Sequence, residues 1–154
     1  MKALLAAVAT GVAAISFSAP ALAGECPADK VGVDVTKPGP MEPTKVTDTV
    51  IAAIDLGKGY NIPGKQLRMR KLVVQPGGIV PWHAHNDRPA NIYVISGEVQ
   101  EYRSTCAVAI THKAGEVVAE SGPLSHWWKN TSKKPAVLIS ADVFTTSGGP
   151  QPGM

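Results

Sequence analysis

The sequence predicts an all-β domain, a sandwich or a barrel, and three observations lead to this prediction. The chain has 154 residues with 15 Gly and 13 Pro, a composition that favours many short strands joined by turns. Turn signals recur roughly every 8 to 12 residues between residues 66 and 144. No segment beyond residue 23 shows the apolar period of a helix.

The first 23 residues resemble a secretory signal sequence. Met1-Lys2 is followed by an apolar run up to Phe17 and then by Ala21-Leu22-Ala23, the small-residue pattern of a processing site. The run is shorter than the ~20 residues that span a bilayer. We therefore expect cleavage after Ala23 and a soluble exported protein, periplasmic or secreted.

The rest of the chain divides into an irregular arm at residues 24–45, a barrel at 46–145 and a disordered tail at 146–154. After a segment at 46–56, the expected strands span residues 66–74, 79–85, 91–95, 98–104, 107–112, 116–119, 125–130 and 135–144. Turns are expected at Pro76-Gly77-Gly78 and at Ser96-Gly97.

Charge excludes two classes of partner. The chain has 15 Lys+Arg against 12 Asp+Glu, and it has no basic run longer than a pair such as Lys133-Lys134. So small a surplus gives no support for nucleic-acid binding, or for membrane binding once the signal is removed.

The two cysteines, Cys26 and Cys106, both lie in the exported part, where one disulfide can form. The alternative is a reactive thiol or a metal ligand, although the spacing matches no redox or zinc motif.

Three histidines indicate a metal site. His83 and His85 alternate with Trp82 and Ala84 along a strand, so both imidazoles lie on one face, and His126 lies in another expected strand. Otherwise the three would be core histidines satisfied by hydrogen bonds. We expect His112 at a turn or on the surface; the alternative is a supporting contact behind a metal ligand.

Residues 78–85 (GIVPWHAH) with 91–97 (NIYVISG) resemble the first motif of the cupins, and residues 115–130 (GEVVAESGPLSHWWKN) resemble the second. The resemblance implies a cupin-type double-stranded β-helix, or jelly-roll barrel, in which His83, His85 and His126 bind one metal ion.

The family's usual glutamate is missing, because Ala90 stands at its position. The site is then expected to be a neutral three-histidine site that prefers Fe, Cu, Zn or Ni over Mn. Asp87 or Glu101 are alternatives for the missing oxygen ligand.

A hairpin turn at Ser96-Gly97 would place Ile92 opposite Glu101 and Ala90 opposite Arg103, facing the metal. Arg103 would then bind a substrate carboxylate, and Glu101 would act as a base or orient Arg103. In the opposite register both are solvated surface charges.

The remaining pocket residues follow from the same strand alternation. His126, Trp128 and Asn130 share one face, so Trp128 is expected to form a wall of the metal cavity, unless it is simply packed in the core. Aromatic side chains on the outer face, such as Tyr93 and Tyr102, suggest a cover formed by the arm or by the second subunit of a homodimer.

We therefore expect an exported metalloenzyme, an oxidoreductase or dioxygenase that acts on a small molecule, such as one that bears a carboxylate. The alternative is a non-catalytic cupin that binds or senses a metal or a small ligand.

Overall fold

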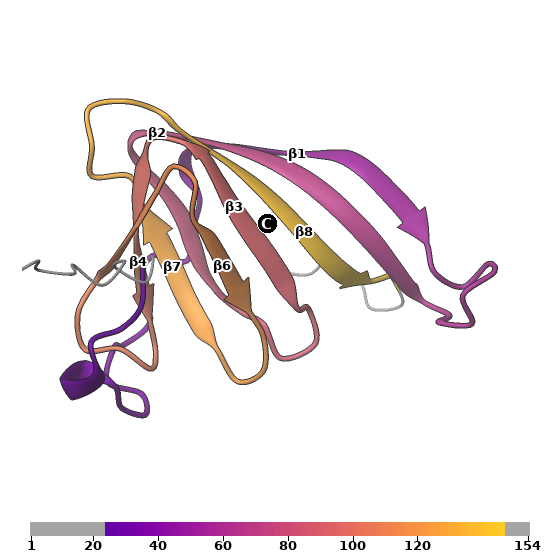
Figure 1. The fold of residues 1–154 in the computed structure, drawn as a ribbon, viewed down its shortest axis with the longest axis horizontal. Helices are drawn as coiled ribbons and strands as arrows, with labels where there is room; N and C mark the ends of the chain where they lie inside the picture. Colours follow the sequence, from indigo (N-terminus) through magenta and orange to yellow (C-terminus); the bar gives the residue numbers. More distant parts are fainter. Residues whose placement is uncertain (1–23, 147–154) are drawn as a thin grey trace, which may run out of the picture.

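The computed structural model describes residues 24–146, so the predicted signal sequence and the tail from residue 147 lie outside the described residues. One antiparallel sheet of eight strands curls into a half-barrel, which confirms the all-β cupin-type fold (Figure 1). The strands are β1 (Thr44–Asp55), β2 (Lys65–Ala84), β3 (Ala90–Ser96), β4 (Glu98–Arg103), β5 (Ile110–Lys113), β6 (Val117–Glu120), β7 (Ser125–Lys129) and β8 (Ala136–Thr145).

The strand order is β5-β4-β7-β2-β8-β3-β6, with β1 added beside β2. Side chains alternate between the hollow of the sheet and its outside, as the burial of β3 and β8 shows. The inward side chains form the core: Leu72, Val74, Val80, Ala90, Ile92, Val94, Val99, Val118, Trp128, Ala136 and Leu138. The core therefore surrounds His83, His85 and His126, which lie on the same inward face of the sheet.

Strand β2 differs from the prediction, because Pro76-Gly77-Gly78 does not separate two strands. The segment is an irregularity within one strand of 20 residues, and Gly77 adopts a positive φ of 74° there. Before it, β2 pairs with β8 up to Val74, and after it β2 pairs with β7 from Ile79. The Pro-Gly-Gly segment therefore carries one strand from one half of the curled sheet to the other.

The predicted hairpin at Ser96-Gly97 is wrong. Strand β3 pairs with β6 and β8, whereas β4 pairs with β5 and β7. The chain passes between the two halves of the sheet at this turn, so the expected pairs of Ile92 with Glu101 and of Ala90 with Arg103 do not form.

The N-terminal arm packs against the half-barrel beside the loop that follows β4. It contains a short 3-10 helix, η1 (Ala28–Lys30), and a single β-bridge from Val31 to Cys106. The backbone N–H of Trp82 donates to the carbonyl of Pro40 over 2.8 Å. The expected cover of the outer face is thus provided in part by the arm.

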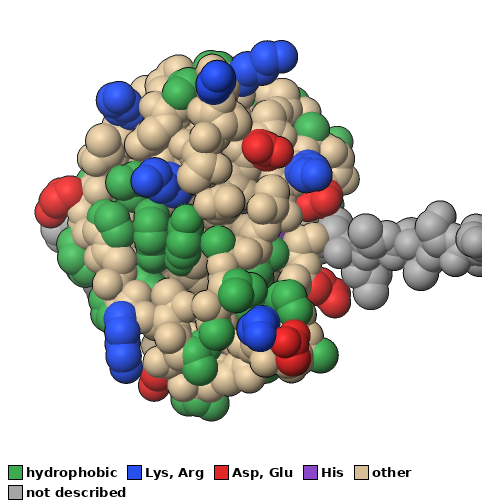
Figure 2. All heavy atoms as spheres, turned by 90° about the vertical axis from the view of Figure 1, so that its left-hand side faces the viewer, with side chains coloured by type: hydrophobic (Ala, Val, Ile, Leu, Met, Phe, Trp, Pro, Cys, Tyr) green, Lys and Arg blue, Asp and Glu red, His purple; other side chains and the backbone are tan. Residues whose placement is uncertain are grey.

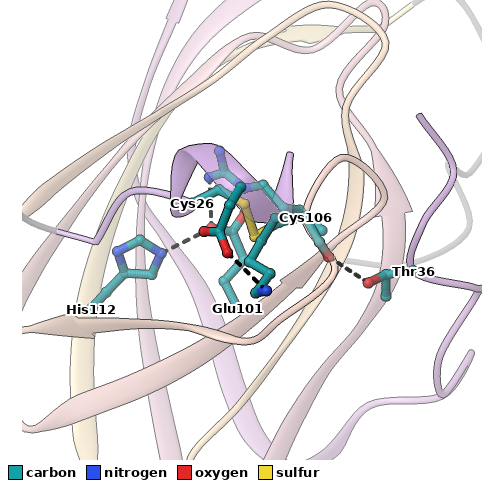
Figure 3. Close-up of a disulfide and its surroundings, with 8 residues drawn as sticks. Cys26, Thr36, Glu101, Cys106 and His112 are labelled. Atoms are coloured by element: carbon teal, nitrogen blue, oxygen red, sulfur yellow. Dashed lines mark hydrogen bonds and ion pairs between the residues drawn. A yellow bond between two sulfur atoms is a disulfide. The ribbon is translucent and has the colours of Figure 1, made fainter. Parts of the chain in front are cut away.

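The disulfide Cys26–Cys106 is confirmed (Figure 3). It fastens the arm to the loop after β4 and leaves no free cysteine in the chain. In the part of the chain that the structure describes, no helix is long and apolar enough to cross a membrane.

Candidate metal centre

Three imidazoles meet inside the half-barrel. His83 lies at the end of β2, His85 directly follows that strand, and His126 lies on β7 directly opposite His83. The Nε2 atom of His126 is 3.0 Å from Nε2 of His85 and 3.2 Å from Nε2 of His83. The structure thus brings together the three residues that the motifs indicated.

A fourth residue, Glu120 at the end of β6, completes the cluster. Its Oε2 lies 3.1 Å from Nε2 of His85, and its Oε1 lies 3.4 Å from Nε2 of His126. One ligand atom from each of the four residues lies within 4.8 Å of the others. Glu120 is 2% exposed, so its carboxylate is enclosed with the imidazoles.

The expectation of a neutral three-histidine site is therefore corrected. Glu120 is the direct cross-strand partner of Ala90, the position where the family pattern would place the glutamate. The methyl group of Ala90 leaves room for a carboxylate that comes from the neighbouring strand. With an anionic oxygen in the set, the argument against Mn no longer holds.

Neither alternative for the missing ligand belongs to this four-residue cluster. Asp87 is exposed on the loop between β2 and β3. Glu101 contacts the far side of the His126 ring, where its Oε1 lies 2.5 Å from Nδ1. The sequence does carry one pointer to Glu120, because it lies within the second motif, six residues before His126.

The donor set fits a divalent metal ion. Two ligand atoms about 2.1 Å from one ion and at right angles to each other lie roughly 3 Å apart, close to the separations observed here. Nδ1 of His83 contacts the carbonyl of Pro81 at 2.8 Å, and Nδ1 of His85 contacts that of Arg88 at 2.8 Å. These contacts keep the proton on Nδ1 and leave each Nε2 lone pair directed into the cluster.

The comparisons with known proteins agree with this geometry. The family model of the cupin domain matches residues 70–142, which include all four residues of the cluster. The chain belongs to the cupin superfamily. It is 30% identical over 109 residues to germin-like protein subfamily 2 member 2 of Arabidopsis thaliana, a match that covers 67% of this chain and 50% of the relative.

It is also 30% identical over 117 residues to nectarin-1 of Nicotiana plumbaginifolia, covering 74% of this chain and 50% of that protein. The cupin chain thus spans about half the length of the curated relatives it matches. Among solved structures it is similar to a protein described as a predicted oxalate decarboxylase of Thermotoga maritima, with a TM-score of 0.53, 17% identity and coverage of 74% and 97% of the two chains. The cupin domain of Schizosaccharomyces pombe Cnp3 gives a TM-score of 0.52 at 11% identity, with 69% of each chain covered. These structures support the fold alone.

Burial sets the protonation of the cupin site. It lowers the pKa of His83 to about 2 and that of His85 to about 4, because desolvation and then the nearby His126 disfavour the charged imidazoles. Burial raises the pKa of Glu120 to about 7. Without a metal, the enclosed cluster therefore favours neutral ligands.

Glu101 is fully buried and binds three groups at once. Its Oε1 contacts His126, and its Oε2 lies 2.9 Å from Nε2 of His112 and 2.6 Å from Nη2 of Arg103 (Figure 3). Burial opposes its ionisation, but hydrogen bonds from His112, His126 and Arg103 outweigh this and hold the Glu101 pKa well below its usual range. Glu101 and Arg103 thus contact each other as expected, on the far side of His126 from the other cluster members.

His112 is not at the surface, contrary to expectation. It is 0% exposed, lies on β5 and stacks on Trp128 with 5.0 Å between ring centroids. The short run before Gly115 suggested a turn, but β5 pairs with β4 and places the His112 ring on the inward face.

A small cavity that opens to solvent adjoins the cluster. Its walls include His83, Glu120, Ile92 and Trp128, two of which were predicted as pocket residues. Ala90 lines a second cavity instead. Asn130 lines neither of these two, because its amide donates to the carbonyls of Val74 and Lys134 and fixes the irregular segment of β2.

Arg70 also lines the first cavity, and sequence reasoning missed it. Its guanidinium forms an ion pair with Asp48 and donates to Oγ of Ser140 over 3.3 Å. The alternation of β2 could have revealed it, since Arg70, Leu72 and Val74 share one face.

Proposed function

We propose that this cupin is an exported metalloprotein that binds one divalent transition metal ion through His83, His85, Glu120 and His126 and carries out oxidoreductase chemistry of the dioxygenase type. The observation that carries the proposal is the convergence of four ligand atoms beside a cavity. A bound transition metal would supply Lewis acidity and one-electron redox chemistry.

The residues of this chain would then bind the substrate and exclude water from the site. Ile92 and Trp128 give the cavity apolar walls. Arg70 and Ser140 place a cation and a hydroxyl on the same cavity, which supports a small molecule that bears a carboxylate as substrate. Arg103 remains a candidate for that role, although it contacts Glu101.

Export is supported by the disulfide, because disulfides persist in oxidising compartments. Sequencing the N-terminus of the protein recovered outside the cytoplasm tests the proposed cleavage after Ala23. An N-terminus at Met1 on the exported protein would contradict it.

The test of the metal site compares the wild type with His85→Ala. Elemental analysis of protein purified from its exported compartment is expected to find about one equivalent of a transition metal in the wild type and far less in the variant. An oxygen-uptake screen with small carboxylic acids then follows. Equal metal content in both proteins would contradict the site.

A non-catalytic role in binding a metal or a small ligand is the second candidate. The four protein ligands favour it, since a tetrahedral ion would have no open position. The exchange of a metal-bound water distinguishes the enzyme from the binding protein. It is measured by the relaxation of solvent protons in the Mn²⁺-loaded protein. Rapid exchange supports the enzyme, and the absence of exchange supports the binding protein.

A further inference from the structure

A buried chain of side chains leads from the metal cluster to the start of the arm. His126 contacts Oε1 of Glu101, and the Oε2 atom of Glu101 contacts Nε2 of His112 over 2.9 Å. All three side chains are 0% exposed. Because Glu101 is an acceptor, Nε2 of His112 carries the proton, and its Nδ1 presents a lone pair.

That Nδ1 atom is buried without a hydrogen-bond partner among the described residues. The nearest carboxylate oxygen in an ion-pair contact, Oε2 of Glu116, lies 3.9 Å away, too far for a hydrogen bond. Two acceptors therefore face each other across a short gap, although Oε2 of Glu116 already accepts from the backbone N–H of Lys113. A positively charged donor placed there would satisfy Nδ1 and pair with the Glu116 carboxylate.

Gly24 lies against this Nδ1 atom. A Cβ added to Gly24 would be 2.0 Å from Nδ1 of His112 and 2.4 Å from its Cε1, and the residue has a φ of +52°. The backbone of Gly24 thus packs directly against the ring. Two residues later, Cys26 fastens this part of the arm to Cys106, beside Glu101 (Figure 3).

We propose that cleavage after Ala23 completes the metal site, because the α-amino group released on Gly24 donates a hydrogen bond to Nδ1 of His112 and pairs with Glu116. The inference rests on the proposed export and metal binding. The ammonium supplies the missing donor, holds the His112 ring, and through Glu101 fixes the orientation of His126. Gly24 is thus a positioning residue for a metal ligand that it does not touch.

The test compares oxidised protein that begins at Gly24 with protein that begins at Ala23. Nitrogen NMR of the histidine rings reports directly on the lone pair of His112 Nδ1, with or without metal. We expect a hydrogen-bonded Nδ1 resonance only in the form that begins at Gly24. Loss of Mn²⁺ or Zn²⁺ to a chelator should be about three- to tenfold faster in the longer form, less than the ~10- to 100-fold typical for a direct partner of a ligand.

Two substitutions, made in the form that begins at Gly24, sharpen the comparison. Gly24→Ala places a methyl group against the ring, and Glu116→Gln removes the carboxylate, so both should reproduce the NMR change of the longer form. Glu25→Ala is the matched control, because the Glu25 side chain is exposed and the change leaves Gly24 intact.

The outcomes separate this inference from the proposed function. The same His112 Nδ1 resonance in both forms would overturn the role of the amino group, even if both bind metal equally well. If neither form binds metal, the proposed metal site fails, while the NMR comparison still decides whether the amino group binds His112.

Discussion

Glu120 brings the negative charge into the candidate metal centre. It lies between His85 and His126 at 3.1 and 3.4 Å, and it is buried with them. Metal-binding carboxylates in an enclosed site compensate the charge of the ion, which neutral imidazoles cannot do. Removal of this one charge should therefore weaken binding more than it disturbs the fold.

The first prediction concerns Glu120→Gln, which keeps the shape of the side chain. We expect the affinity for Mn²⁺ or Zn²⁺ to fall by about 100-fold or more, measured by chelator competition. Asp87→Asn is the control, because Asp87 is exposed outside the cluster. Equal losses in the two variants would show that Glu120 is not a ligand.

The second prediction concerns pH. Glu120 has a pKa raised to about 7 in the metal-free cluster, whereas His83 and His85 have pKa values lowered to about 2 and 4. Below pH 7 the metal must displace the Glu120 proton, while these two imidazoles are already neutral. Affinity should therefore fall about tenfold per pH unit between about pH 7 and 5.

Calorimetry in buffers of different ionisation enthalpy measures this proton directly. About one proton should be released per metal bound near pH 6, and Glu120→Gln should reduce the release. Affinity that does not change between about pH 5 and 7 would contradict the proposed ligand set.

At the level of the strands, the pairing of β3 with β6 explains how a carboxylate at position 120 can occupy the space where the cupin motif would place one from position 90. Ala90 and Glu120 are direct partners, so a side chain from either position reaches the same inward space. Sequence reasoning could identify the vacant position but not its neighbour, because pairing between strands 30 residues apart is not encoded in local spacing.

The third prediction follows from this pair. Ala90→Glu alone should destabilise the metal-free chain, since two carboxylates would share one buried space. Combined with Glu120→Ala, it should restore part of the metal affinity that Glu120→Ala removes. The double-mutant cycle measures this coupling, and strictly additive losses would show that the two positions do not share one space.

Two predicted turns also differ in the structure, and both lie where a strand changes its pairing partner. Pro76-Gly77-Gly78 and Ser96-Gly97 both carry turn-forming residues, yet the first lies within β2 and the second does not form a hairpin. Local turn propensity indicates a change of direction or a bulge, and tertiary packing decides which.

At the scale of the whole molecule, the disulfide and the apolar outer surface determine how the sheet is covered. Figure 2, which shows the side of the molecule toward β4 and β7, shows hydrophobic side chains gathered on a face where histidine contributes hardly any surface. The site itself is enclosed, since His85, Glu120 and His126 are buried, while apolar groups remain on this outer face. The arm and its disulfide cover part of that outside.

The fourth prediction concerns Cys26–Cys106, which joins residues 80 apart in sequence. Loop-closure entropy predicts that Cys26→Ser with Cys106→Ser lowers the free energy of unfolding by about 3 to 5 kcal/mol. Urea denaturation of the wild type, oxidised and reduced, and of the variant measures this. The reduced wild type should match the variant, and a loss below about 1 kcal/mol would contradict the prediction.

The fifth prediction concerns the homodimer, which remains an expectation. Strand β1 pairs on one side only within the described sheet, and Val50, Ile51 and Ile54 are about half exposed on it. If a second copy covers this edge, Ile51→Lys should convert a dimer to a monomer in sedimentation. Val117→Lys on β6 is the control, and a wild-type monomer at micromolar concentration would contradict the expectation.

Local order along the chain was sufficient to predict most of the strands, the two cupin motifs, the disulfide and three members of the candidate metal cluster, because strand alternation and motif spacing act over a few residues. Only the folded chain revealed Glu120 as the fourth member of this cluster, Arg70 in the cavity wall and His112 behind Glu101. These residues meet through pairings between distant strands of a curled sheet, and such pairings depend on how the whole chain packs.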